Sequence, residues 1–530
     1  MGHWNAGWRA TQLPELARRE WDLIVVGGGI CGAGILREAA RRGWKCLLLE
    51  QRDFAWGTSS RSSKMVHGGL RYIAKGQFGL TRASVRERQR LLAEAPGLVE
   101  PLSFVMPHRG GFPGPRVFGS LLALYDALAG RRNHLYYPLQ QLRYLVPGLT
   151  EEGLEGGTRF FDAVTDDARL VMRVLGEARA EGGEAVNGMR VLALQREAGR
   201  VSGLEAEDLE SGQRFSFRSR AVALATGAWA DRLRAAHGTE HIRPLRGSHL
   251  LLPGWRLPLA HAISFMHPSD GRPVFVFPWE GATVIGTTDL DHTEGLDQDA
   301  RISEAEVDYL LAACARQFPA AQIGRGDVLS TWAGVRPVVS EGDAQLKPSD
   351  EKREHALWVE PGCVTLAGGK LTTFRLLALE VLRACAGFVG RELEDHGSAV
   401  FQPDDGLTHP LLSSAQRLRL AGRHGRAMPE LVRWVGLLGN ERIGATDSLW
   451  AELAWAAEGE LVLHLDDLLL RRTRMGLLLP GGARSELPRI RALCQPLLGW
   501  DDARWTQEEA DYLALWQRCY SLPDKNKDAS

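Results

Sequence analysis

The segment from Asp22 to Glu50 constrains the fold of this chain more than any other. It reads DLIVVGGGICGAGILREAARRGWKCLLLE, which is an apolar run, a glycine cluster, a helical pattern, a second apolar run and a closing acid. This succession predicts one βαβ unit. We expect Gly27 to permit the tight turn from strand to helix, Gly29 to let the backbone approach a pyrophosphate, and Gly32 to let the helix pack closely on the strand.

The same unit carries the groups that a dinucleotide needs. A helix N-terminus offers unpaired N–H groups and a partial positive charge to phosphates. Glu50 ends the second apolar run about 20 residues after the glycines, where a carboxylate can accept hydrogen bonds from ribose hydroxyls. The sequence therefore predicts a dinucleotide site. The alternative, a glycine-rich turn in an unrelated α/β protein, leaves Glu50 without a purpose.

Composition excludes several classes of protein. The 530 residues are enough for roughly two or three domains, and a net charge of -1 provides no basic field that would recruit nucleic acid. The seven cysteines are scattered without CxxC spacing, which favours structural thiols in a reduced compartment. No apolar run reaches the roughly 18 residues that span a bilayer, and the N-terminus lacks the apolar core of a signal peptide, so we expect a cytoplasmic or peripheral protein.

Periodicity divides the chain into segments that alternate between domains. Arg220–Leu224 predicts a third strand of the nucleotide sheet, which returns long after the first two. Residues 246–290 alternate like antiparallel strands and suggest an inserted domain that covers the substrate. Val364–Lys370 predicts another strand, glycine turn and helix. After residue 405 the pattern changes to amphipathic helices, predicted at Leu411–His424 and Leu449–Arg474.

With these segments in place, the chain resembles the FAD-dependent glycerol-3-phosphate dehydrogenases, within the glutathione-reductase-like and D-amino-acid-oxidase-like flavoproteins. The matching motifs occur in the family's order between Gly27 and Thr373, and they are GGGICGAG, TSSRSSKMVHGGLRY, DDARL, ATGAW, RGSH, FVFPW, GTTD, GVRP and GGKLTT. LDDLLLRRTRMG also resembles the family's C-terminal domain. GGGICGAG alone indicates an FAD-binding fold, whereas HGGLRY with GVRP and GGKLTT is far more specific.

Pattern and resemblance together predict an α/β fold. It has a discontinuous Rossmann-like FAD-binding domain, an antiparallel-sheet substrate domain and a C-terminal all-helical domain. The expected boundaries are 1–98, 156–245 and 331–395 for the FAD-binding domain, 99–155 and 246–330 for the substrate domain, 405–522 for the helical domain, and 523–530 for a disordered tail.

The resemblance implies FAD as the cofactor. Serine and threonine side chains between residues 58 and 63 can hydrogen-bond the pyrophosphate or the polar edge of the flavin, or cap the next helix. Val186 would supply a backbone contact to adenine. The cofactor-site residues implied are Gly27, Gly29, Gly32, Glu50, Thr58, Ser59, Ser62, Ser63, Lys64, His67, Gly68, Gly69, Val186, Ala225, Thr226, Gly227, Gly369, Lys370, Leu371 and Thr372.

Cations in the same motifs indicate an anionic substrate. A phosphate monoester carries about −1.5 to −2 charges near pH 7, and guanidinium groups match its oxygens with paired hydrogen bonds. The resemblance implies substrate contacts from Arg71 and Tyr72 of HGGLRY, Arg336 of GVRP and Lys370 of GGKLTT. Arg353 joins them, although its KREH only approximates the family's motif. For any single arginine, a surface or helix-capping role is the alternative.

The reaction implied is oxidation of sn-glycerol 3-phosphate at C2 to dihydroxyacetone phosphate, with hydride passing to flavin N5 and the hydroxyl proton to a base. His249 of RGSH and His67 of HGGLRY are the candidate bases, because imidazole titrates near the working pH. We favour His249, with Arg336 and Lys370 completing the catalytic set. A structural role is the alternative for either histidine.

The resemblance also implies partners. The chain has no cysteine cluster for an iron–sulfur centre and no second glycine motif for NAD. The family resemblance implies a quinone acceptor at the membrane. Oxygen, as in the glycerophosphate oxidases, is the alternative. Contact with the inner face of the membrane would be peripheral. The apolar residues within 115–132 have the spacing of a helix that could make this contact, but packing of the helix in the core is the first interpretation. Arg471, Arg472 and Arg474 predict a solvated helix face, with a partner or lipid contact as alternatives. A homodimer is compatible with the sequence.

Two other functions stay open on this scaffold. An amine or 2-hydroxy-acid oxidase predicts flavin reduction by an amino or hydroxy acid, and a carboxylate needs fewer cations than are found here. A flavin-binding sensor or scaffold, docking a partner through its helical domain, predicts bound FAD that no small alcohol phosphate reduces.

Overall fold

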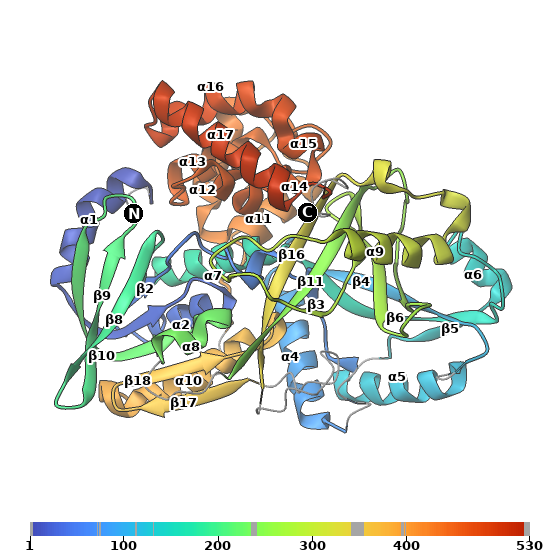
Figure 1. The fold of residues 1–530 in the computed structure, drawn as a ribbon, viewed down its shortest axis with the longest axis horizontal. Helices are drawn as coiled ribbons and strands as arrows, with labels where there is room; N and C mark the ends of the chain where they lie inside the picture. The colour runs from blue at the N-terminus through green and yellow to red at the C-terminus, as the bar shows by residue number, and fades with distance from the viewer. Residues whose placement is uncertain are drawn as a thin grey trace.

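The computed structural model describes residues 4–70, 73, 76–111, 114–130, 132–234, 241–340, 355–393, 397 and 399–523. Two sheet-based lobes lie side by side, and a helical lobe sits over the junction between them (Figure 1). The predicted tail, 523–530, lies outside the described residues from 524 onward.

The first lobe is built on the nucleotide sheet, with strand order β17-β18-β10-β1-β2-β7 and with β8 and β9 extending from β10. Its strands are β1 Glu20–Val26, β2 Cys46–Leu49, β7 Glu184–Val186, β8 Met189–Glu197, β9 Arg200–Asp208, β10 Arg214–Leu224, β17 Ala356–Glu360 and β18 Cys363–Ala367. Strand β1 is parallel to β2 and β10, and β10 is parallel to β18. Distant segments therefore form one sheet, as the discontinuous fold predicts.

Helices cover both faces of this sheet. They are α1 Ala6–Arg18, α2 Ile30–Ala40, α7 Asp167–Ala180, α8 Ala230–Leu233 and α10 Phe374–Val389. Leu23 and Val25 of β1 are buried in one core, whereas Ile24 and Val26 are buried in another. A parallel strand covered on both faces reads as a continuous apolar run, which explains the sequence of β1.

The second lobe is built on a sheet with strand order β15-β11-β14-β13-β12-β4-β6-β3, with β16 on β11 and β5 on β6. Its elements are β3 Met65–Val66, β4 Val99–His108, β5 Leu135–Pro138, β6 Gly156–Thr165, β11 Ile242–Pro253, β12 Ala262–Met266, β13 Pro273–Trp279, β14 Ala282–Gly286, β15 Leu290–Asp291, β16 Ser330–Val339, α4 Phe78–Glu94, α5 Pro115–Ala129, α6 Leu139–Leu145 and α9 Glu304–Gln317. The pairs among β11 to β14 are antiparallel, as predicted.

Two expected domain boundaries differ from this topology. The sequence predicts that the FAD-binding domain resumes at residues 156 and 331, but β6 and β16 pair with β4 and β11 in the second sheet. Strand partners this far along the chain leave no local signal in the sequence, so the boundaries could not be placed by periodicity.

The third lobe is helical, as predicted. Its elements are α11 Ser414–His424, α12 Met428–Leu438, α13 Trp450–Gly459, the π-helix η8 Asp467–Arg472, α14 Met475–Leu478, α15 Pro480–Ala483, α16 Leu487–Leu498 and α17 Asp502–Cys519. The single helix expected over Leu449–Arg474 is wrong. The chain leaves α13 at Leu461, whose φ is +48°, and the Asp467 carboxylate accepts the N–H groups of Leu463 and His464 at 2.9 Å each.

The arginines of η8 and its C-terminal end also correct the sequence analysis. Arg471, Arg472 and Arg474 are each 2% exposed, and they form ion pairs with acids of the first lobe. The solvated helix face predicted for them is therefore wrong, because long-range carboxylates draw these side chains inward.

A search of the described helices finds none with the length and apolar character needed to cross a membrane. Within the described ranges, no group of three or more histidine, cysteine or acidic side chains is arranged to hold a metal ion. The seven cysteines are free thiols, and all but Cys31 are buried.

Candidate cofactor and substrate site

A cleft of about 310 Å³ opens at the carboxyl edge of the nucleotide sheet. Val26 at the end of β1, Glu50 after β2, Ala225 after β10 and Gly368 after β18 all line it. In open α/β sheets, ligand sites form outside the carboxyl ends of the strands. The cleft therefore stands where the opening βαβ unit predicts a dinucleotide.

The glycine turn has the geometry that the sequence predicts. Gly27 has φ +110°, and a Cβ there would lie 2.5 Å from the Ala225 carbonyl oxygen. A Cβ on Gly32 would lie 1.8 Å from the Gly27 carbonyl oxygen. The tight turn and the close helix packing predicted for these two residues are confirmed. Gly29 is the N-cap of α2 and lines the cleft, so the first amides of the helix face it.

The Glu50 side chain is fixed at the mouth of the cleft. Its carboxylate accepts the N–H groups of Gly28 at 2.6 Å and Arg52 at 2.8 Å. Burial raises the pKa of Glu50, while these backbone hydrogen bonds act in the opposite direction. The location suits a ribose, and this contact stays a prediction.

The loop after β2 supplies hydroxyl groups to the cleft. Thr58, Ser59 and Ser62 line it, and Ser59 Oγ accepts the Ile30 N–H at 3.0 Å. The Lys64 side chain is an exception among the predicted contacts. Its ammonium is buried and donates to both Asp167 oxygens, at 2.9 and 3.0 Å, and to the Ser60 carbonyl at 2.6 Å. It therefore faces Asp167 rather than the cleft.

The predicted cofactor residues divide into two groups. Those that line the cleft are Gly27, Gly29, Glu50, Thr58, Ser59, Ser62, Ala225, Thr226, Gly227, Gly369, Lys370 and Leu371. Those that are described but do not line it are Gly32, Ser63, Lys64, His67, Gly68, Gly69, Val186 and Thr372.

Several members of the second group have structural contacts. Thr372 Oγ1 donates to the His67 carbonyl at 3.2 Å, which ties the two motifs together. A Cβ on Gly68 would lie 2.0 Å from the Tyr125 hydroxyl, so Gly68 permits close packing. The Val186 carbonyl accepts the Glu50 N–H at 2.9 Å.

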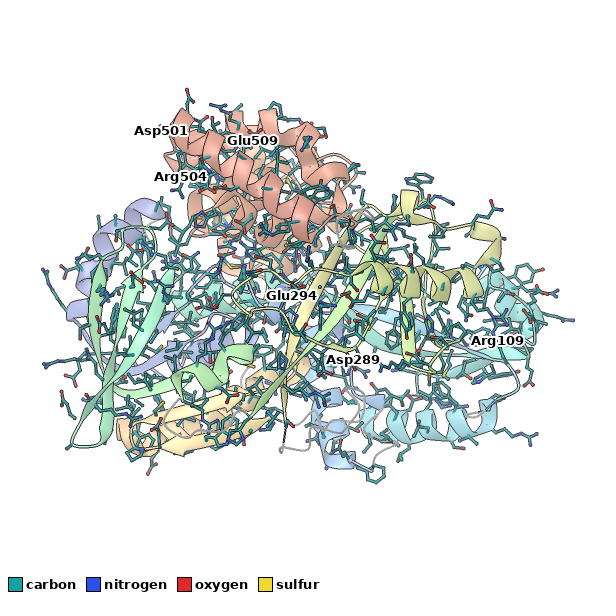
Figure 2. All side chains as sticks on the ribbon, viewed as in Figure 1. Arg109, Asp289, Glu294, Asp501, Arg504 and Glu509 are labelled. Carbon is teal, nitrogen blue, oxygen red and sulfur yellow. The ribbon has the colours of Figure 1, made fainter. Side chains whose placement is uncertain are left out.

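Two of the predicted substrate cations can be placed. Lys370 lines the cleft directly, and Arg336 lies on β16 one residue before Pro337, which also lines it. The Arg336 guanidinium forms an ion pair with Asp289 at 2.8 Å and donates to Thr287 Oγ1 at 3.3 Å. Figure 2 labels Asp289 near the middle of the molecule, on the second-lobe side of the junction. Arg71, Tyr72 and Arg353 lie outside the described residues.

His249 lies on β11 beside these groups and is buried. Its ring stacks on Trp332 with centroids 4.8 Å apart, and its Nε2 is 2.9 Å from Ser63 Oγ. Its Nδ1 has no hydrogen-bond partner among the described residues. Burial, followed by the charges of Arg336 and Lys64, holds the pKa of His249 well below its usual value. The imidazole is therefore neutral near pH 7, which is the form that can accept a proton.

Several lining residues were missed by the sequence analysis. Trp56 and Trp229 face each other with ring centroids 5.7 Å apart. Asp297, from the second lobe, accepts the Trp229 indole N–H at 3.3 Å and pairs with Arg232 at 2.6 Å. Each tryptophan follows a strand of the nucleotide sheet within a small-residue loop, in AWGTSS after β2 and in ATGAW after β10, and this is the signal that could have identified the pair. Met189, Arg190 and Val191 of β8 also line the cleft.

The residues present fit a dinucleotide cofactor. The glycine turn leaves room for a close backbone approach, and the first residues of α2, Ile30 and Cys31, line the cleft. Thr226 Oγ1 is buried beside the cleft without a hydrogen-bond partner in the described part of the chain. A buried polar atom of this kind is expected to be satisfied by a ligand.

Comparison with known proteins identifies the family to which this chain is similar. Residues 22–375 match the family model described as FAD dependent oxidoreductase, and residues 387–505 match the C-terminal domain of alpha-glycerophosphate oxidase. The chain is 33% identical over 532 residues to glycerol-3-phosphate dehydrogenase 2 of Mycobacterium tuberculosis, covering 96% of this chain and 90% of the relative. It is 35% identical over 405 residues to the aerobic glycerol-3-phosphate dehydrogenase of Bacillus subtilis, covering 74% and 71%.

Solved structures agree with this relationship. The FAD complex of glycerol-3-phosphate dehydrogenase from Bacillus halodurans superposes with a TM-score of 0.78 at 27% identity, covering 97% of this chain and 98% of that chain. L-alpha-glycerophosphate oxidase from Mycoplasma pneumoniae shares the fold, with a TM-score of 0.58 at 17% identity over 72% of this chain and 98% of that chain. The chain therefore belongs to the FAD-dependent oxidoreductases and, among them, to the glycerol-3-phosphate dehydrogenase family, with FAD as its cofactor.

Proposed function

We propose that this protein oxidises sn-glycerol 3-phosphate at C2 to dihydroxyacetone phosphate and passes the electrons to a quinone-type acceptor. The observation that supports the proposal most is that Lys370 lines the cleft of a chain of this family, with Arg336 on β16 next to Pro337, which also lines it. Bound FAD supplies the acceptor for the hydride that leaves C2. All other steps depend on residues of the chain itself.

The cofactor would be held by groups at the carboxyl edge of the sheet. The amides at the start of α2 hold the pyrophosphate, with the Ser59 hydroxyl beside them. Glu50 accepts hydrogen bonds from the ribose, and Thr226 Oγ1 gains the partner that it lacks within the described residues.

Arg336 and Lys370 bind the substrate phosphate. The ion pair with Asp289 fixes the Arg336 guanidinium before substrate arrives, so less side-chain entropy is lost on binding. Lys370 adds a second positive charge from the turn after β18. A phosphate monoester carries more negative charge than a carboxylate and accepts more hydrogen bonds from two cations, which disfavours the amine and 2-hydroxy-acid oxidase alternatives.

His249 takes the proton of the C2 hydroxyl. Its neutral imidazole is next to Ser63, and Ser62 of the same loop lines the cleft. With bound FAD as the hydride acceptor, the imidazole would take the hydroxyl proton, so that charge and atoms balance when the C2–H bond breaks. The low pKa of His249 lets it release this proton readily afterwards.

A lysine substitution tests the phosphate site. Arg336→Lys keeps the charge but loses the planar fork, so we expect higher KM, lower kcat and about a 10-fold loss in kcat/KM with unchanged FAD content. The matched control is Arg243→Lys, because Arg243 pairs with both oxygens of Asp291 at 2.7 and 2.9 Å elsewhere in the same sheet. Unchanged kinetics for Arg336→Lys would remove this residue from the substrate site.

A peripheral membrane contact is part of the proposal, since quinones dissolve in the bilayer. Helix α5 packs Phe118 into the core, as the first interpretation of this segment predicts. Its outer face carries Val117 and Leu124, which are 51% and 41% exposed, and Leu121 and Leu128 of the same helix are partly buried. This spacing places the four apolar side chains along one stripe of the helix. We assign the stripe to the lipid contact.

Vesicle binding tests this assignment. We expect the protein to sediment with vesicles that contain phosphatidylglycerol, and we expect Val117→Glu with Leu124→Glu to weaken sedimentation while FAD content is unchanged. Val359→Glu is the control, because Val359 is 56% exposed on β17, in the first lobe. Equal sedimentation of the double variant and the wild type would refute the assignment.

The acceptor needs its own measurement, because the C-terminal segment matches a domain described from a glycerophosphate oxidase. The enzyme reduced by substrate is mixed separately with oxygen and with a soluble quinone. Reoxidation by the quinone should be the faster. Faster reoxidation by oxygen would make the protein an oxidase.

A further inference from the structure

The helical lobe reaches into the FAD-binding lobe through three arginines, Arg471, Arg472 and Arg474. All three are buried, and their partners are acids of segments that lie beside the cofactor cleft. They come from the π-helix η8 and the residues just after it. π-helical turns are rare and are frequent at functional sites.

Arg471 and Arg472 hold the first part of the loop that follows β2. The Nε of Arg471 lies 2.5 Å from one Asp53 oxygen, and Arg472 donates to both Asp53 oxygens at 2.7 Å. The next residues turn back on the glycine cluster, where the Ala55 N–H donates to the Gly28 carbonyl at 3.0 Å. The arginines therefore fix a turn that packs directly against the pyrophosphate-binding backbone.

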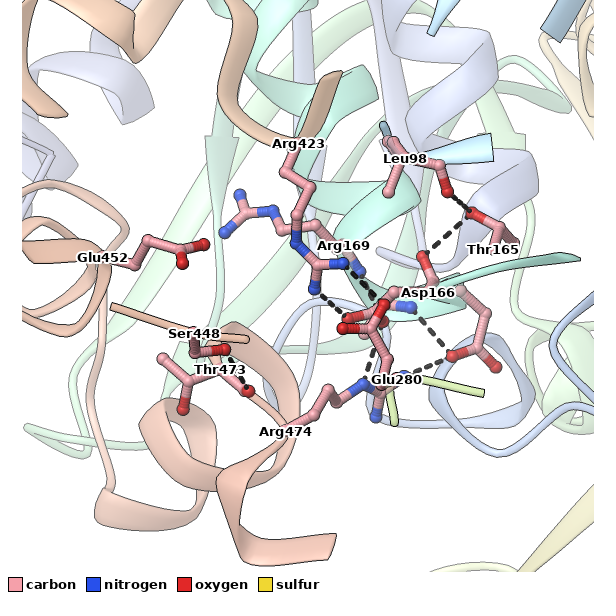
Figure 3. Close-up of polar contacts among 12 residues, drawn as sticks. Leu98, Thr165, Asp166, Arg169, Glu280, Arg423, Ser448, Glu452, Thr473 and Arg474 are labelled. Carbon is pink, nitrogen blue, oxygen red and sulfur yellow. Dashed lines mark hydrogen bonds and ion pairs between the residues drawn. The ribbon is translucent and has the colours of Figure 1, made fainter. Parts of the chain in front are cut away.

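Arg474 holds the second part of the same loop. Its guanidinium donates to the Ser60 carbonyl at 3.2 Å, pairs with Asp166 at 2.9 Å and also pairs with Asp167. Asp167 in turn accepts the Ser62 N–H at 3.0 Å and the Ser62 hydroxyl at 2.7 Å. Figure 3 shows Arg423 and Arg474 reaching Asp166 from opposite sides, and Arg423 donates to it from α11. Since Ser62 lines the cleft, the chain of contacts runs from the helical lobe to the cofactor site.

The free-energy cost of burying these arginine–carboxylate pairs indicates that the position in which they hold the loop matters for function. Burying ion pairs is expensive, and apolar contacts would join two lobes more cheaply. Arg474 also has φ +59°, which is uncommon for a residue other than glycine. Such conformations persist where the surrounding structure fixes them, and they cluster at functional sites.

We propose that the helical lobe positions the cofactor loop, with Arg471 and Arg472 fixing it at Asp53, and Arg474 fixing it at Ser60 and, through Asp167, at Ser62. Arg474 and Asp167 are thus positioning residues for FAD. The inference rests on FAD as the cofactor and does not depend on the substrate, so its tests are independent of the proposed reaction.

The affinity of the apoprotein for FAD is the first test. Arg474→Lys keeps the charge but cannot bind Ser60, Asp166 and Asp167 together, so we expect the Kd for FAD to rise about 10- to 100-fold. Amides of residues 58–62 should also exchange hydrogen faster. The control is Arg489→Lys, because Arg489 makes a two-pronged ion pair with Glu441 at 2.6 Å on the exposed face of the same lobe. A Kd for Arg474→Lys within about 2-fold of the wild type would overturn the proposal.

Native-state hydrogen exchange on the wild-type holoenzyme gives a second test that needs no variant. Contacts that open together exchange as one unit. As urea rises below the global transition, amides of residues 57–64 should lose protection together with those of α13 and α14. Loss of loop protection before these helices, or loop protection that outlasts them, would each show that the lobe does not hold the loop.

Discussion

Replacing Gly32 with alanine would test the close packing on which the dinucleotide site depends. The new Cβ would lie 1.8 Å from the Gly27 carbonyl oxygen, about half the ordinary contact distance of 3.4 Å, and 3.5 Å from Leu48 Cδ1. The clashing atom belongs to the backbone, so no side chain can move aside. Either α2 or the Gly27 peptide must shift, and both border the cleft at which we expect the pyrophosphate.

The expected loss in FAD affinity can be bounded. Overpacking a tight site costs about 1–3 kcal/mol. If the protein must take up this strain in order to hold FAD in the native position, the free energy of FAD binding falls by the same amount and the Kd rises about 5- to 150-fold. Alanine also favours a helix over glycine by up to about 1 kcal/mol, and this gain partly offsets the strain. The Kd is measured by titrating apoprotein into FAD and following flavin fluorescence.

Gly176→Ala is the matched control for this experiment. Gly176 lies within α7 of the same lobe, and a Cβ there would meet no atom within 4 Å. This variant should bind FAD like the wild type, with equal or slightly higher melting temperature. If Gly32→Ala bound FAD with the same Kd as Gly176→Ala, the packing argument would be refuted.

Two further predictions concern single side chains. Glu50→Gln removes the negative charge of a side chain that accepts two backbone N–H groups in the cleft lining, so the Kd for FAD should rise about 10-fold. An unchanged Kd in the same titration would remove Glu50 from the cofactor site. Burial alone would lower the pKa of His464, but its hydrogen bonds to Glu210 and Glu508 raise it overall. The His464 imidazolium therefore stabilises the folded protein fully below its unfolded pKa of about 6.5, and this contribution is lost as pH rises through the raised value. In calorimetry, the difference in Tm between wild type and His464→Gln should shrink from pH 6 upward, and a difference that grows with pH would contradict the assignment.

The features that could be predicted from the sequence are those with local signals. Gly27, Gly32 and Glu50 lie within one βαβ unit, and their spacing alone determines the turn, the helix packing and the acid at the strand end. The antiparallel strands expected within residues 246–290 also form, although burial alternates only in part of β13, and β11 is buried continuously from Gly247 to Leu252.

What could not be predicted depends on partners far along the chain. The arginines of η8 predict a solvated charged face because the local sequence shows their charges but not the carboxylates with which they pair. Arg471 meets Asp53 at a separation of 418 residues, and Arg474 meets Asp166 at 308. Lys64 was expected at the cofactor for the same reason, since its buried partner Asp167 is 103 residues away. The break after α13 lies just before these arginines: the chain turns at Leu461 and η8 begins at Asp467, where periodicity predicts one continuous helix.

The central claim is that the cleft brings a phosphorylated alcohol to FAD. Its most direct test is an anaerobic titration of the oxidised holoenzyme with sn-glycerol 3-phosphate, followed by the absorbance of the oxidised flavin. We expect the oxidised band to be lost in proportion to the substrate added, with dihydroxyacetone phosphate as the product and with no loss on addition of glycerol or an amino acid. An oxidised band that persists in excess sn-glycerol 3-phosphate would contradict the proposed function.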